Sequence, residues 1–92
     1  MKVKILQADI KCRYKFMSLK FAKENGFTLN DYKEVFSGEV DAENLEDVFV
    51  IFNMDNRPNG RTMHSLSMSD IVINDEGMWY CDTFGLKNLL NV

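Results

Sequence analysis

The residue types that could do chemistry gather in one polar segment of this chain. The segment contains the only histidine, three serines at alternate positions and an aspartate: His64, Ser65, Ser67, Ser69 and Asp70. A serine hydrolase needs a base bonded to the serine hydroxyl and a third group that orients this base. In an extended segment, the adjacent side chains of His64 and Ser65 point to opposite sides, so this pair is poorly placed for such a reaction. No G-x-S-x-G turn surrounds any serine, and we expect a protein that is not an enzyme, with a small hydrolase as the weakest alternative.

The serines and Asp70 also have a structural interpretation. Side chains of Ser and Asp bond to nearby backbone groups and thereby fix turns and the starts of strands. If the segment is extended, the three serines share one face, while Leu66 and Met68 share the other and can be buried. The alternative is a binding surface formed by His64, the serines and the preceding loop.

Other reactive residue types are too few or too scattered for a site. Cys12 and Cys81 have no C-x-x-C spacing, and two cysteines with one histidine offer too few zinc ligands. The carboxylate pairs at 46–47 and 75–76 fall in a helix start and a turn, where they do not form an acid–base pair. No phosphate loop or dinucleotide fingerprint is present. We therefore expect no cofactor and no metal, and we expect Cys81 to be a buried, inert thiol.

Hydrophobic periodicity predicts the elements that position these residues. Strands are expected at residues 3–8, 31–41, 70–74 and 78–84. Short helices are expected at residues 19–25, between Ser18 as N-cap and Gly26 as terminator, and at about 45–52. We also expect a bulge or tight turn at Ser37-Gly38, and a last strand or helical turn near Leu86.

This order, β-α-β-α-β-β, predicts an α+β fold. We expect a small, mostly antiparallel sheet of about four strands, with the two short helices packed on one face. The 92 residues make one domain, because a second core would not fit in so short a chain.

The charge is unevenly distributed along the chain, although its net value is only -3. Residues 1–23 carry seven basic side chains and one acid, whereas residues 24–92 carry four basic and thirteen acidic side chains. So many acids argue against a nucleic-acid partner. The basic segment either pairs with acids inside the fold or forms a face for an acidic partner. Without a signal peptide or a long apolar run, we expect a cytoplasmic protein that does not enter membranes, as a monomer or homodimer.

Two longer strings resemble the signature of the YodL-like family. They are HSLSMSDIV at residues 64–72 and, after the predicted hairpin turn, YCDTFG at residues 80–85. Two upstream strings are similar to other parts of the family pattern, YKEVFSG at 32–38 and LEDVFVIFN at 45–53. The resemblance covers roughly residues 14–90. One departure is the loop before His64, where Arg61, Thr62 and Met63 separate Gly60 from the histidine, although family members often have a Gly directly before it.

The resemblance implies a small bacterial protein or a module of phages and conjugative elements, with no established catalytic residues. One branch of the family resembles an inhibitor of the actin-like cell-shape cytoskeleton. We therefore expect a protein-binding module that inhibits a host protein, such as a defence nuclease of the anti-CRISPR or antirestriction type, with the cytoskeleton as the alternative target. The residues expected to bind the partner are Arg57, Arg61, His64, Ser65, Ser67 and Trp79. The residues expected to serve the structure are Ser69, Asp70, Asp82, Phe84 and Gly85.

Overall fold

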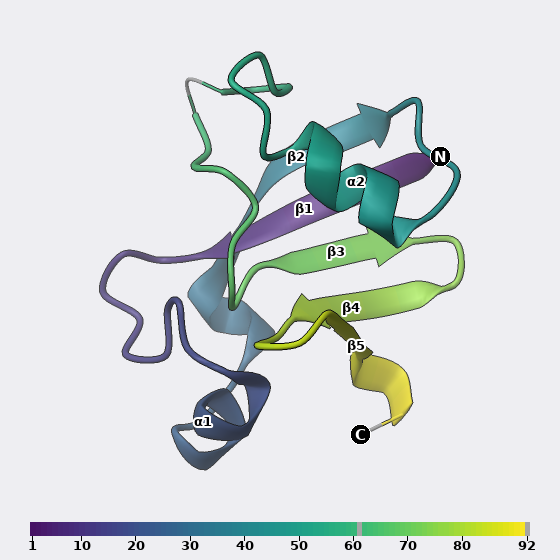
Figure 1. Cartoon of the computed structure of the whole chain (residues 1–92). Coiled ribbons are helices and arrows are strands. Elements are labelled where there is room, and N and C mark those ends of the chain that lie inside the picture. The colour runs from purple at the N-terminus through teal and green to yellow at the C-terminus, as the bar shows by residue number, and fades with distance from the viewer. Residues whose placement is uncertain (61, 92) are drawn as a thin grey trace.

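The computed structural model describes residues 1–60 and 62–91, with the backbone only for residue 91. Over these residues the chain forms one five-stranded antiparallel sheet in the order β2-β1-β3-β4-β5 (Figure 1). The strands are β1 (Lys2–Ala8), β2 (Tyr32–Glu39), β3 (Ile71–Asn74), β4 (Gly77–Cys81) and β5 (Leu86–Asn88). The helices are α1 (Leu19–Glu24) and α2 (Leu45–Ile51), with 3₁₀ turns η1 (Leu29–Asp31) and η2 (Leu89–Asn91).

The predicted α+β class is confirmed, and the sheet has one strand more than expected. The predicted strand at 78–84 ends earlier, because the chain turns at residues 82–85 and returns as β5. Gly85 occupies this turn with a φ of +78°, a conformation that costs least for glycine. Both alternatives for the carboxyl end occur, since β5 is followed by the η2 turn.

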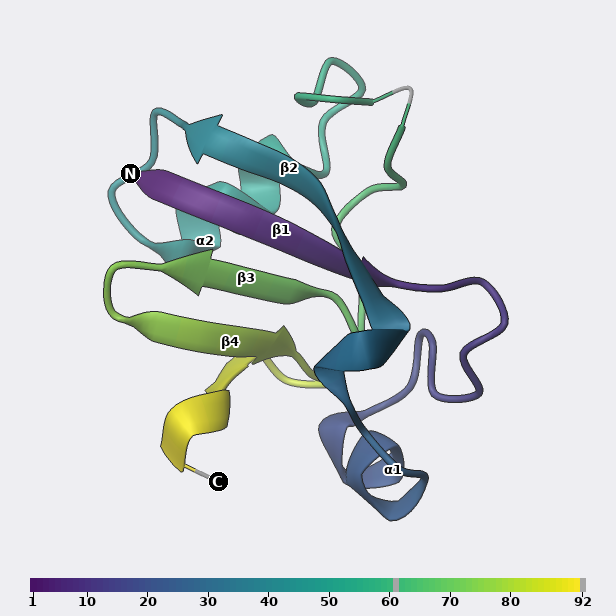
Figure 2. The same cartoon turned by 180° about the vertical axis from the view of Figure 1, so that it is seen from behind.

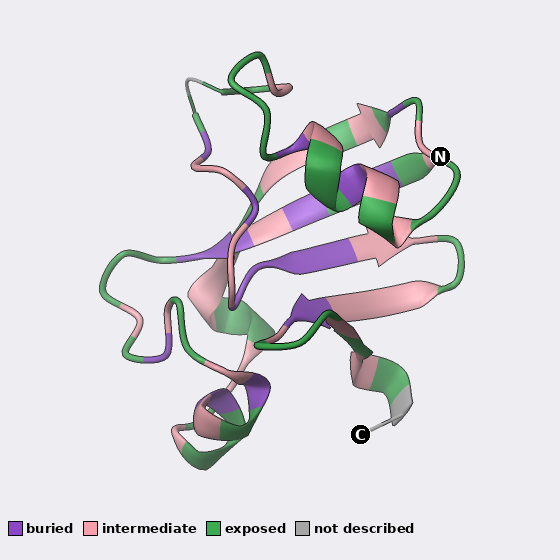
Figure 3. Ribbon diagram, viewed as in Figure 1, coloured by how far each residue is buried: buried purple, intermediate pink, exposed green. Residues whose placement is uncertain are grey.

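The helices pack on opposite faces of the sheet, so the prediction that both cover one face is wrong. Val48 of α2 belongs to the same apolar cluster as Ile5 and Val72. Figure 3 shows the buried stretches of β1 and β3. Leu19 of α1 belongs to a second cluster, which contains Ile71 of β3. Consecutive strand residues face opposite sides, so the apolar run through β3 supplies a core on each side. In Figure 2 the sheet is seen from behind, with α2 on its far side.

Both helices begin at an N-cap, and the sequence predicts the one at Ser18. The Ser18 hydroxyl accepts a hydrogen bond from the Phe21 N–H at 3.2 Å, and Asn44 Oδ1 accepts one from the Asp47 N–H at 2.9 Å. Gly26 follows α1 with a φ of +80°. Neither helix is long, and no helix among the described residues could cross a membrane.

The bulge in β2 lies at Val35 and not at Ser37-Gly38. Ile5 pairs with Phe36 and Leu6 pairs with Glu34, so Val35 is the extra residue. The side-chain amide of Asn59, from the loop after α2, donates to the Val35 carbonyl oxygen at 2.8 Å. The loop is thereby attached to the outer edge of the sheet.

Candidate functional site

The serine-containing segment is a turn and not an extended stretch, so its serines do not share one face. The Asp70 N–H donates to the Ser67 carbonyl oxygen at 3.0 Å, and Ser69 has a φ of +81°. The Ser69 N–H donates to the Cys81 carbonyl oxygen at 2.9 Å, and the Cys81 N–H donates to the Asp70 carbonyl oxygen at 2.8 Å. These two bonds extend the pairing of β3 with β4 into the turn and hold it at the end of the sheet.

Asp70 is fully buried at the centre of a polar cluster. Its Oδ2 atom accepts hydrogen bonds from the Ser67 N–H at 2.8 Å and from Gln7 Nε2 at 3.0 Å. Its Oδ1 atom has no hydrogen-bond partner among the residues that the structure describes. Burial raises the pKa of this carboxyl to about 6, and the hydrogen bond from the Ser67 N–H partly opposes that rise.

His64 has a partner at each ring nitrogen. Nδ1 lies 2.7 Å from the Ser65 carbonyl oxygen, and Nε2 lies 3.2 Å from Lys15 Nζ. Gln7 Nε2 lies 3.0 Å from Asp70 Oδ2, from the His64 carbonyl oxygen and from Nδ1, and its two hydrogens suffice for the two oxygens. These contacts assign the hydrogen to Nδ1, which donates to Ser65, and leave Nε2 to accept from Lys15. The ring is thus held in place by the backbone and by a lysine.

The serine hydroxyls form bonds that do not involve His64. Ser67 Oγ donates to the Ser65 carbonyl oxygen at 2.8 Å, and Ser69 Oγ accepts from the Phe16 N–H at 2.8 Å. Across residues 1–60 and 62–91, no hydrogen bond joins a serine hydroxyl to the imidazole. The geometry that an activated serine nucleophile requires is therefore not formed by these residues.

Ser69 connects the turn to two distant segments. In addition to the bond from Phe16, its carbonyl oxygen accepts from the Tyr32 hydroxyl at 2.7 Å. Both Phe16 and Ser69 have positive φ values, +67° and +81°, which are uncommon for residues other than glycine. The surrounding hydrogen bonds therefore stabilise a backbone that is locally strained.

The other residues predicted to serve the structure lie in the turn between β4 and β5. Asp82 Oδ1 accepts from the Leu19 N–H at 3.1 Å and from the Thr83 N–H at 2.8 Å, so it links this turn to the start of α1. The Asp82 N–H donates to the Gly85 carbonyl oxygen at 2.9 Å. Phe84, between them, is 85% exposed and adds no packing to the core.

The described residues among those predicted to bind a partner lie partly around the turn at His64 and partly in β4. Ser65 and Ser67 lie next to His64 in the turn, and Arg57 Nη2 donates to the Met63 carbonyl oxygen just before it. Trp79 is half-buried in β4, where its Nε1 donates to Asn74 Oδ1 at 3.1 Å near the β3–β4 hairpin. Arg61 lies outside the described residues.

The basic amino-terminal segment is mostly free of ion pairs. Among residues 1–60 and 62–91, Lys4 is the only one of its seven basic side chains in a salt bridge, at 3.8 Å from Glu34. Lys15 contacts the Ala8 carbonyl oxygen and the His64 ring. The loop at 9–17 lies at the opposite end of the sheet from the loop at 40–44 and the hairpin turn (Figures 1 and 2). The interpretation that this segment pairs inside the fold is therefore wrong for most of its charges.

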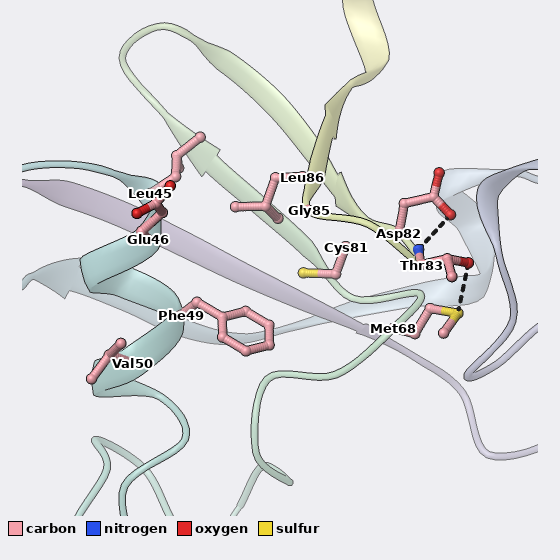
Figure 4. Close-up of a pocket in the computed structure, with 10 residues that line it drawn as sticks. All are labelled: Leu45, Glu46, Phe49, Val50, Met68, Cys81, Asp82, Thr83, Gly85 and Leu86. Carbon is pink, nitrogen blue, oxygen red and sulfur yellow. Dashed lines mark hydrogen bonds between the residues drawn. The ribbon is translucent and has the colours of Figure 1, made fainter.

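An apolar groove opens between α2 and the turn at residues 82–85 (Figure 4). It has a volume of about 710 Å³ and is lined by Leu45, Glu46, Phe49, Val50, Met68, Cys81, Asp82, Thr83, Gly85 and Leu86. A helix of seven residues is only about 10 Å long and cannot cover the face of a five-stranded sheet. Phe49 and Val50 are consequently 41% and 60% exposed.

Cys81 lies in the floor of the apolar groove and is itself buried. Burial raises the pKa of its thiol well above the ordinary value, and the Asp70 charge acts in the same direction. A thiol with a raised pKa is a poor nucleophile, which agrees with the predicted inert cysteine. Among the described residues, no group of three His, Cys, Asp or Glu side chains is placed to hold a metal ion.

Comparison with known families matches residues 1–91 to the YodL-like domain, which is nearly the whole chain. The chain belongs to the YodL-like domain family. No curated protein and no solved structure matches it. The family resemblance seen in the sequence is thus confirmed.

Sequence reasoning missed the apolar groove of this YodL-like domain. The periodicity at Leu45, Val48, Phe49 and Phe52 indicates one buried face, but the structure buries Val48 and Phe52 fully and leaves Phe49 at the rim. The only signal in the sequence was the continuous apolar run from Val48 to Phe52, which is wider than one helix face needs. In chemical terms, the groove offers apolar contact area and two carboxylates at its sides.

Proposed function

We propose that this YodL-like domain is a non-enzymatic protein-binding module that binds its partner in the apolar groove. The observation that supports this proposal is the groove itself, which is open, has a mostly apolar lining and a volume of about 710 Å³, on a chain of 92 residues. Contiguous exposed apolar surface is costly in water, and it marks interaction sites on soluble domains. His64 and the Ser67 hydroxyl form hydrogen bonds to other groups and not to each other, which supports a binding function in preference to hydrolysis.

Phe49 and Val50 are the central contacts in this proposal. They lie next to each other on α2, while the neighbouring Val48 and Phe52 anchor the helix in the core. A partner can therefore bury the exposed pair without disturbing the fold. Complete burial of a fully exposed Val or Phe side chain contributes about 1.5–3 kcal/mol, and because Phe49 and Val50 are 41% and 60% exposed, a partner can gain about half of that at each.

The proposal extends to a role as an inhibitor in the bacterial cytoplasm. The domain would act by occupying a surface of a host protein, deployed by a phage or another mobile element. A defence nuclease is the first target class, and the actin-like cell-shape cytoskeleton is the alternative. Both rest on the family resemblance.

Affinity capture with matched variants tests the proposal. Val50→Glu places a charge in the apolar groove, whereas Leu90→Glu places one at another exposed apolar position, 70% exposed, outside the groove. We expect a bacterial protein that is captured by the wild type and by Leu90→Glu but not by Val50→Glu, with all three chains folded by circular dichroism. Equal capture by the three chains would contradict a role for the groove.

Overexpression then separates the two target classes. Rounding of rod-shaped cells that is lost with Val50→Glu indicates the cytoskeletal target. Normal cell shape, together with loss of restriction or CRISPR interference, indicates a defence nuclease. If neither effect occurs, the proposed role as an inhibitor of these targets is wrong.

A further inference from the structure

Three backbone N–H groups in the floor and wall of the apolar groove, at residues 81–83, are already paired. The Cys81 N–H donates to the Asp70 carbonyl oxygen, and the Asp82 N–H donates to the Gly85 carbonyl oxygen at 2.9 Å. The Thr83 N–H donates to Asp82 Oδ1, and Leu86 pairs with Cys81 across β4 and β5. At Cys81, Asp82 and Thr83 the groove therefore offers no free N–H with which an extended peptide could pair, and the free edge on this side of the sheet is the outer side of β5, beyond Leu86.

This pairing selects the secondary structure of the occupant. An extended peptide would bring its own N–H and C=O groups into the apolar groove without partners, and each unpaired buried group costs about 1–3 kcal/mol. An α-helix satisfies these groups internally and presents only side chains. A helix beside α2 would also complete the layer that one short helix leaves open on this face (Figure 4).

The charges at the rim of the groove indicate which charges the occupant should carry. Glu46 on α2 and Asp82 in the opposite turn are the only charged residues among those described as lining the groove. Asp47 is adjacent to Glu46 in the first turn of α2, which adds negative charge on that side. Complementary charges favour the correct partner and steer its approach.

We propose, on the basis of the protein-binding function above, that the apolar groove takes an amphipathic helix of the partner whose apolar stripe is flanked by Lys or Arg. The apolar stripe contacts Phe49, Val50 and Leu86. The flanking cations lie near Glu46 and Asp82.

Two synthetic peptides of about 18 residues test this inference, because shorter isolated helices are only marginally stable. Both carry the same leucine stripe, with Lys at the flanking positions of one peptide and Glu at those of the other. Binding is followed by chemical-shift changes in the isotope-labelled protein. We expect the Leu/Lys peptide to bind saturably with changes in α2 and residues 81–86, and to bind at least fivefold more tightly than the Leu/Glu peptide.

Charge reversal identifies the responsible group. Glu46→Lys should reduce the preference for the Leu/Lys peptide about two- to fivefold, as expected for one exposed charge pair. Glu24→Lys makes the same change of net charge at an exposed position at the end of α1, and it should leave the preference unchanged. Asp82 is not substituted in this test, because its carboxylate accepts a hydrogen bond from the Leu19 N–H and thereby helps to hold the fold. Equal affinity for the two peptides, equal effects of the two reversals, or shifts centred on residues 9–23 would overturn the inference.

The outcomes also separate this inference from the proposed function. If Val50→Glu abolishes capture of the natural partner but the peptides show no charge preference, the groove binds a partner and the inference about a basic helix is wrong. If the Leu/Lys peptide is preferred but capture is unaffected by Val50→Glu, the charge selectivity stands and the proposed function through the groove is wrong.

Discussion

The buried carboxyl of Asp70 makes the stability of the fold depend on pH in an unusual direction. Burial raises its pKa from 3.8 to about 6. Between these two values the carboxyl is protonated in the native protein and ionised in the unfolded chain, so the native state binds more protons. Stability contributed by this group therefore rises as the pH falls from above 6 towards 4. Each pKa unit corresponds to about 1.4 kcal/mol, so the full change is about 3 kcal/mol.

The Asp70→Asn variant isolates this contribution. Asparagine keeps an oxygen that can accept from the Ser67 N–H and from Gln7, but it has no charge to bury. Its amide nitrogen takes the place of Oδ1, which has no partner among the described residues, and this costs about 1–3 kcal/mol at every pH. The useful quantity is therefore the change with pH of the difference between wild type and variant, and not its value at one pH.

Urea unfolding between pH 4 and 7.5 measures that difference, with the fluorescence of Trp79, the only tryptophan, as the probe. We expect the wild type to gain about 2 kcal/mol relative to Asp70→Asn as the pH is lowered from 7.5 to 4, with most of the gain below pH 6. Asp55→Asn, in the exposed loop after α2, controls for the loss of one negative charge. A difference that is constant with pH, or that moves against the wild type on acidification, would refute the reasoning.

Three further predictions concern packing, capping and thiol reactivity. Phe52→Ala should lower the free energy of unfolding, measured by chemical denaturation, by about 3–5 kcal/mol because the ring is fully buried. Phe84→Ala should change it by less than about 0.5 kcal/mol because this ring is exposed. Equal losses in the two variants would contradict the difference in burial. Asn44→Ala should cost about 1 kcal/mol in the same assay, because the Asp47 N–H loses its cap, and no loss would mean that water replaces the cap fully. Cys81 should react with iodoacetamide only in denaturant, because its thiol is buried and its pKa is raised. Mass spectrometry of the labelled peptide measures this reaction. Rapid labelling in the native state would disprove the burial of Cys81.

Local signals were sufficient for the elements of this fold. The Ser18 cap, the glycine after α1 and the hairpin turn act within a few residues, so the helix at 19–24 and the β3–β4 hairpin follow from the sequence. The placement of the helices on two faces was also encoded, in the uninterrupted apolar run Ile71-Val72-Ile73. A strand with only one buried face would alternate between apolar and polar residues.

Long-range contacts decided what the sequence could not reveal. The turn at Ser69 is held by the Phe16 N–H and the Tyr32 hydroxyl, which are 53 and 37 residues away in the chain. Its conformation could not be predicted from the spacing of the serines. The apolar groove depends on how much of the sheet α2 leaves uncovered, which is a property of the packed structure and not of any motif.

The outer edge of β2 also limits how this domain can meet copies of itself. An eight-residue edge strand presents backbone groups that can recruit another strand, and repeated addition of this kind builds fibrils. Here the extra residue at Val35 breaks the regular register, Asn59 occupies the Val35 carbonyl oxygen, and the exposed Lys33 and Glu34 carry charge along the strand. Although 46% of its residues are hydrophobic, the chain should therefore not add further strands at this edge of the sheet.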